Sequence, residues 1–186
     1  MKTHEINGKD YLFVTLEKCG PLVGNGRAVG GGNGGSQRGK GGVSIYDITD
    51  PTNPHSVKQN FLDSPVHNTF PWTNENGSYM LVVDDIAIND LHVVDISKPQ
   101  APKLIATTGI GDWIDTTTIG DDDQLFTGSF AAPLLHDIWV EQVNGQWQGV
   151  LSYWDAGFVT VDLTDPYNPV FLGDSTYPAT DPVHGI

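Results

Sequence analysis

The chain has 186 residues, 38% of them hydrophobic, with 22 Gly and 12 Pro. This is enough apolar material for a folded core, and Gly and Pro spread between short apolar runs are typical of turn-rich all-β proteins. The formal net charge is −14, and all nine Lys and Arg lie at or before Lys103, whereas residues 104–186 hold 12 acidic residues and no Lys or Arg. Because phosphate binding needs clustered cations, we expect no nucleic-acid partner. The single cysteine, Cys19, excludes an internal disulfide.

A four-strand unit with one insert is predicted in the first third of the chain. Residues 4–14 are expected to form a short hairpin, because Asn-Gly lies between apolar runs. After a Gly-rich loop insert at residues 24–42, Val43–Ile48 is apolar on both faces, which is typical of a strand between two layers. Asp50–Asn53 fits a type I turn, and Ser56–Phe61 follows as the last strand.

The same order of elements recurs twice. A strand, an Asn-Gly turn and a strand are predicted at residues 67–83 and again at residues 136–154. Short closing strands are predicted at Lys103–Ala106 and Val170–Gly173. The second unit is followed by a hairpin-like insert at residues 115–133. No segment has convincing helical periodicity.

A motif of 12 residues marks each unit, at Val43–Pro54, Leu91–Pro102 and Phe158–Pro169. Each copy has an apolar run with Asp fifth, then an aliphatic residue, Ser or Thr, and two prolines three apart. The recurring Asp47, Asp95 and Asp162 are expected to cap the following turn; general acid–base chemistry is the alternative.

These motifs resemble those of the LVIVD-repeat proteins, a β-propeller family of bacteria and archaea. The resemblance implies an all-β fold of four-stranded antiparallel blades, with about three complete blades and a partial one in a single domain, 1–186. The end of the chain, Pro182–Ile186, echoes Pro65–Asn68 and is expected to begin that further blade. The ring is expected to be incomplete here, because raw sheet edges call for missing blades from the rest of a longer chain or from another copy.

Histidines lead the repeated hairpins at His4, His67 and His136, with His184 at the next start. If the units are blades, these side chains converge at one mouth of the central channel, and we expect His67, His136 and His184 as candidate ligands of a transition metal. The alternative is that each His satisfies a backbone group in its own blade.

The Gly-rich segment invites comparison with a phosphate-binding loop. Gly34–Lys40 fits its first seven positions, but Gly41 stands where Ser or Thr is needed, and a strand follows instead of a helix. A surface loop with partner contacts at Arg27, Arg38 and Lys40 is the preferred interpretation.

Two further groups of residues are expected to be structural. The acidic clusters at Asp84-Asp85 and residues 121–123 lack calcium-ligand spacing and are expected in solvated turns. The aromatic residues are expected to pack between blades: Trp72, Trp139, Trp147, Tyr153 and Trp154.

The sequence favours a non-enzymatic protein- or glycan-binding or scaffolding surface, since it contains no nucleophile elbow, HExxH or Cys–His pair. The alternative is a metal-dependent enzyme with the histidine cluster at the channel mouth. No run approaches 18 apolar residues, so no transmembrane segment is expected, and none of signal-peptide length opens the chain. The family resemblance implies an extracellular, periplasmic or cell-surface location.

Overall fold

The computed structural model describes residues 1–17, 41–62, 64–84, 89–113, 135–153 and 157–175. These residues form three four-stranded antiparallel sheets, each built from strands consecutive in sequence. The first sheet consists of β1 (Lys2–Ile6), β2 (Lys9–Leu16), β3 (Gly42–Asp47) and β4 (His55–Phe61). The second consists of β5 (Val66–Asn74), β6 (Gly77–Asp84), β7 (Leu91–Asp95) and β8 (Lys103–Thr108). The third consists of β9 (Leu135–Val143), β10 (Gln146–Tyr153), β11 (Gly157–Asp162) and β12 (Val170–Asp174).

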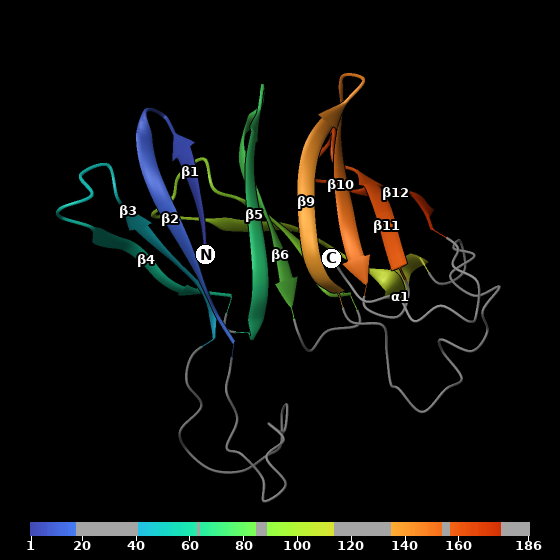
Figure 1. Cartoon of the computed structure of the whole chain (residues 1–186), viewed down its shortest axis with the longest axis horizontal. Helices are drawn as coiled ribbons and strands as arrows, with labels where there is room; N and C mark the ends of the chain where they lie inside the picture. The colour runs from blue at the N-terminus through green and yellow to red at the C-terminus, as the bar shows by residue number, and fades with distance from the viewer. Residues whose placement is uncertain (18–40, 63, 85–88, 114–134, 154–156, 176–186) are drawn as a thin grey trace, which may run out of the picture.

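The prediction of four-stranded antiparallel units is confirmed, and we call the sheets blades 1, 2 and 3. Figure 1 shows the blades arranged as a fan, with β1, β5 and β9 side by side, and β5 contacts both of the other two strands. These first strands therefore lie innermost, where a propeller has its channel. One short helix, α1 (Ile110–Trp113), follows β8 and was not expected from the sequence. The two predicted inserts fall mainly on residues 18–40 and 114–134, outside the described residues, although Gly42 begins β3.

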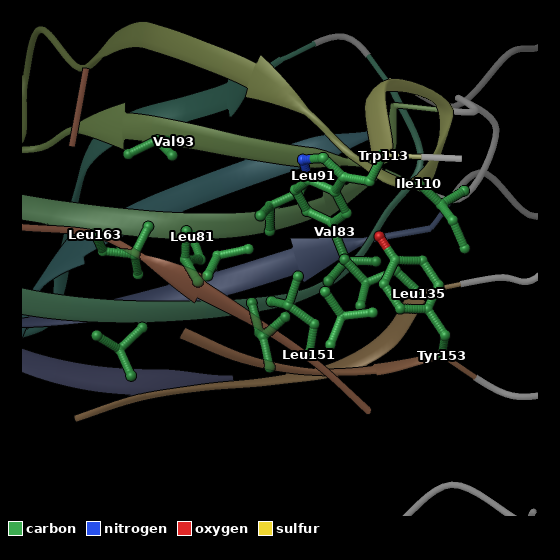
Figure 2. Packing of buried hydrophobic residues seen from close by; sticks show 14 of the residues in the cluster. Leu81, Val83, Leu91, Val93, Ile110, Trp113, Leu135, Leu151, Tyr153 and Leu163 are labelled. Carbon is green, nitrogen blue, oxygen red and sulfur yellow. The ribbon is translucent and has the colours of Figure 1, made fainter. Parts of the chain in front are cut away.

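Blade 2 is buried on both faces, as its continuous apolar strands predict. Along β6, Leu81 and Val83 join a cluster with blade 3, whereas Met80 and Val82 join a separate cluster with blade 1. All four side chains have 0% exposure. Figure 2 shows the cluster between blades 2 and 3, in which Leu81 lies with Leu151. The alternation of period two along a strand therefore assigns successive side chains to two different blade interfaces.

The predicted role of the repeated Asp as a cap is confirmed in all three blades. In each, a carboxylate oxygen accepts from the backbone N–H two residues later, at 2.8–3.0 Å: Asp47 from Thr49, Asp95 from Ser97, and Asp162 from Thr164. Hydrogen bonds from Thr49, together with Lys9, lower the pKa of Asp47 to about 2. The Asp is therefore a structural acceptor at the end of each third strand.

The turn after each cap also repeats. The backbone N–H groups of Asn53, Ala101 and Asn168 donate to the carbonyl three residues earlier, at 2.8–3.0 Å, which is the bond of a β-turn. The hairpin turns are less uniform. Asn7-Gly8 and Asn144-Gly145 are the two-residue loops with positive φ that were predicted. In blade 2, Asn74 pairs with Gly77, so the loop is Glu75-Asn76 and the predicted Asn-Gly turn is wrong by one residue.

Candidate functional site

Two β-bulges stand at the start of the inner strands β5 and β9. In β5, Val66 pairs with Asp84 and Thr69 with Val82, so two residues, 67 and 68, face the single position 83. In β9, Leu135 pairs with Tyr153 and Asp137 with Ser152, so His136 is the extra residue. A bulge bends the strand and re-aims the side chains at the irregular position.

The bulges bring His67 and His136 together. Their ring centroids lie 4.5 Å apart with an interplanar angle of 48°. Nδ1 of His67 also lies 2.6 Å from Oε1 of Glu17, which follows β2 of blade 1. Side-chain exposure is 30% for His67 and 51% for Glu17, so this side of the contact is partly open to solvent. Groups from three blades thus meet at one end of the inner strands.

The residues that follow the two histidines also bind each other. Nδ2 of Asn68 donates to Oδ1 of Asp137 at 2.5 Å, and the same oxygen accepts the backbone N–H of Ile138 at 2.9 Å. In blade 1, Oγ1 of Thr15 donates to the carbonyl of His67 at 3.3 Å. These contacts hold both histidine backbones in place, so the pair is a positioned feature of the fold.

His4 does not join this pair. It lies three residues before its hairpin loop, whereas His67 and His136 each lie eight residues before theirs. Its Nε2 lies 2.8 Å from Oγ1 of Thr73, and burial lowers its pKa. The expectation that the leading histidines share one position therefore fails for His4, because the first hairpin begins later in its strand.

The other predicted site residues lie outside the described part of the chain. These are His184, expected as a third metal ligand, and Arg27, Arg38 and Lys40, expected as partner contacts. Within the described residues there is no group of three or more His, Cys, Asp or Glu that could hold a metal ion. The proximity of His67 to His136 agrees with the predicted convergence for two of its three members.

A buried polar row crosses blade 2 at the same end. His92 is 8% exposed, and its Nε2 lies 3.2 Å from Oδ2 of Asp84, while its Nδ1 lies 3.0 Å from Oγ1 of Thr107. Oδ2 of Asp84 also accepts from Oγ of Ser64 at 2.6 Å. Asp84 is only 7% exposed, so its expected place in a solvated turn is wrong; the residue ends β6 inside the blade. His92 is likewise packed inside blade 2.

A second buried carboxylate joins blades 2 and 3. Oδ1 of Asp90 accepts from the hydroxyl of Tyr153 at 2.9 Å, and Oδ2 accepts from the backbone N–H of Leu135 at 3.1 Å. Asp90 is 2% exposed and Tyr153 is fully buried. Burial raises the pKa of Asp90 to about 6, although these two hydrogen bonds oppose the shift. This joint could not be predicted from the sequence, because Asn-Asp before a strand is typical of an exposed turn.

The aromatic residues divide into buried and exposed members. Trp72 is 3% exposed and lies in the core between blades 2 and 3, as expected. Trp139 is 54% exposed, yet it also packs between blades, as expected, because its ring contacts Phe70 of blade 2. Its ring lies against Phe70, with centroids 4.9 Å apart, and Nζ of Lys2 lies 5.4 Å from the centroid of Phe70. Lys2, Phe70 and Trp139 each lie five residues before their hairpin loops, one on each inner strand.

The comparisons agree with this architecture. The family model described as the LVIVD repeat matches residues 76–108, which cover β6, β7 and β8. No curated protein matches the chain. Among the described residues, no helix is long and apolar enough to cross a membrane. Blades 1 and 3 repeat the capped Asp and the β-turn of the matched segment. The chain therefore contains an LVIVD repeat at residues 76–108, and the described residues form three four-stranded blades, as in an incomplete propeller.

Proposed function

We propose that this chain is a non-enzymatic propeller that binds a protein or glycan ligand at the end of the inner strands marked by the histidine pair. The observation that carries the proposal is the contact between His67 and His136, which the two bulges create at an exposed edge between blades. Bulges are enriched beside functional sites because they re-aim side chains.

The chemistry around the pair suits a polar ligand. Imidazole nitrogens donate or accept hydrogen bonds, and the carboxylates of Glu17 and Asp137 accept them from hydroxyl, amide or ammonium groups. Trp139, exposed against Phe70 on the same inner strands, adds an aromatic surface on which a sugar ring or an apolar side chain can pack. Arg27, Arg38 and Lys40, in the Gly-rich segment, are proposed as further partner contacts in this otherwise acidic chain. The compartment proposed is extracellular, periplasmic or the cell surface.

The test is a screen of the whole chain against defined glycans and peptides, followed by titration of each hit. We expect the His67→Ala/His136→Ala double variant to weaken binding by about tenfold or more, as loss of a central contact does. His55→Ala is the matched control, because His55 lies on the outer strand β4 with a side chain 62% exposed. A hit that binds the double variant and the control equally well would place the ligand elsewhere, and the absence of any hit in both classes contradicts the proposal.

A metal-dependent enzyme is the second candidate, favoured by the contact between the two imidazoles and by the carboxylate of Glu17 beside His67, although these described residues do not by themselves form a metal-binding group. Imidazole and carboxylate together suit Zn²⁺ or another transition metal, and His184 is proposed as a further ligand. Elemental analysis of the purified chain, before and after incubation with Zn²⁺, measures this directly. Stoichiometric metal that the double variant loses and His55→Ala retains would favour the enzyme. Equal metal content in all three proteins would exclude the pair as ligands.

A further inference from the structure

Each interface between blades in this chain is made in the same way. We call the face of a blade that looks toward the next blade in the chain its forward face, and the opposite face its rear face. The forward face of blade 1, with Phe13 and Ile45, packs on the rear face of blade 2, with Met80, Val82 and Val94. The forward face of blade 2 packs on the rear face of blade 3 through Leu81, Val83, Leu151, Val159 and Val161. One type of apolar joint is thus used twice.

The rear face of blade 1 carries the residues that this joint requires. By strand register, Leu12 pairs with Tyr46 as Met80 pairs with Val94 in blade 2. Val14 corresponds to Val82, because Val14 follows Leu12 by two residues and Val82 follows Met80 by two residues.

These rear-face residues of blade 1 remain partly open to solvent. Leu12, Val14 and Tyr46 are half-buried, and Leu16 at the end of the strand is 40% exposed. The corresponding residues of blade 2 are covered by blade 1 and are fully buried. Apolar residues therefore occupy positions that another blade covers elsewhere in the same molecule.

The forward face of blade 3 is the complementary surface. By strand register, Trp139 and its partner Val150 correspond to Phe70 and Leu81 of blade 2. Phe158, which pairs with Ser152, corresponds to Leu91, which pairs with Val83. Val150 and Phe158 are half-buried, and Trp139 is 54% exposed. In blade 2 these positions contribute to the joint with the next blade. Blade 3 thus presents two aromatic side chains and a valine where the joint needs apolar residues.

We propose that the rear face of blade 1 binds the forward face of blade 3 of a second copy of this chain, so that two copies associate head to tail. The repeat specifies the partner, because in both joints of this structure a rear face is covered by the forward face of another blade. Because the contact is heterologous, the same joint can form twice between two copies and close a ring. The described residues of two copies would supply six blades, within the usual four to eight blades of a propeller. This assembly does not require a ligand at the histidine pair, but it would cover Trp139, so the joint and the ligand packing proposed above are alternative uses of that side chain.

The experiment is sedimentation or light scattering of the full 186-residue chain over a range of concentrations, with one charge placed on each face. Val14→Glu alters the rear face of blade 1 and Val150→Glu the forward face of blade 3. Leu104→Glu is the control, because Leu104 is 46% exposed on β8, the outermost strand of the covered blade 2. Circular dichroism checks that each variant keeps its strands.

We expect the parent chain and Leu104→Glu to reach the mass of two chains, and each of the other two variants to stay at the mass of one. An equimolar mixture of Val14→Glu and Val150→Glu should regain the mass of two chains, since each variant supplies one intact face. If either variant does not fold, Trp139→Ser replaces an exposed side chain instead and should weaken association by about tenfold or more. A parent chain that stays monomeric, a mixture that stays monomeric although the parent associates, or a folded Trp139→Ser that associates like the parent would each overturn the proposal.

Discussion

Replacing Asp90 with Asn removes an ionisable group from the joint between blades 2 and 3. The carboxylate is 2% exposed and is held by the hydroxyl of Tyr153 and the backbone N–H of Leu135. Desolvation raises its pKa to about 6, while the two hydrogen bonds and the nearby His92 favour the charged form. Asn keeps the shape and one acceptor oxygen, but its amide cannot accept from Leu135 and does not titrate.

The raised pKa makes the joint weaker as the pH rises. In the unfolded chain Asp90 ionises near its ordinary pKa of 3.8, and in the folded chain near 6. Between these values the folded state binds more protons than the unfolded state, so the free energy of unfolding falls with rising pH. The gap between the two pKa values corresponds to ~3 kcal/mol, at about 1.36 kcal/mol per pKa unit. This contribution is fully present below about pH 4 and is lost above about pH 6.

The assay is urea unfolding of the parent chain and of Asp90→Asn at pH 4, 5, 6 and 7. At pH 4 the variant should be less stable by about 1–3 kcal/mol, because Asn leaves the N–H of Leu135 without its acceptor. Between pH 4 and pH 7 the parent should lose up to ~3 kcal/mol relative to the variant, because only the parent has a buried charge at pH 7. The difference in stability between the two proteins should therefore shrink or reverse sign. Asp10→Asn, at an exposed position, is the control, and its free energy of unfolding should change with pH as that of the parent chain does. If the curves of Asp90→Asn and the parent are parallel from pH 4 to 7, the buried-carboxylate reasoning is wrong.

Three further substitutions test the packing and the caps. Gly149→Ala should destabilise the chain by about 1–3 kcal/mol in urea unfolding, because an added Cβ would lie 2.9 Å from Cγ2 of Val161 in the joint between blades 2 and 3. Leu81→Ala should cost about 2–5 kcal/mol in the same assay, since Leu81 is fully buried in that joint. Asp95→Ala should cost about 1 kcal/mol by removing the acceptor for Ser97, and Asp95→Asn should recover part of the loss.

The repeated motif predicted the parts of the fold that depend on local chemistry. Asp followed two residues later by Ser or Thr fixes the cap, and the Pro that follows Asp50, Lys98 or Asp165 favours the next turn, so both features occur in every blade where the motif places them. The apolar run before the Asp predicted burial on both faces, which Leu91 and Val94 show in the two separate cores. These features are local in sequence, so they can be predicted without knowledge of the neighbouring blade.

The candidate site was predicted only in part, because it depends on register. The sequence placed His67 and His136 at the same end of their blades, but it contained no signal for the bulges that turn them toward each other. It also grouped His4 with them, because all three histidines lead a hairpin, although His4 lies closer to its hairpin loop than His67 and His136 do. The burial of Asp90 could not be predicted either, since it arises from packing against a blade that begins 45 residues later at Leu135.

The two ends of the blades differ in how far their residues repeat, and this difference supports the end at which we propose a binding site. At one end, the caps of Asp47, Asp95 and Asp162 and the turns after them repeat with the same hydrogen bonds in each blade. Residues that are fixed by a turn in every unit cannot vary with the ligand. At the other end, the corresponding positions differ between blades: Asp84 of blade 2 corresponds by register to Leu16 of blade 1 and Tyr153 of blade 3. The histidine pair lies at this second end, where side chains differ between blades, and this variation supports the proposal that this end binds a partner.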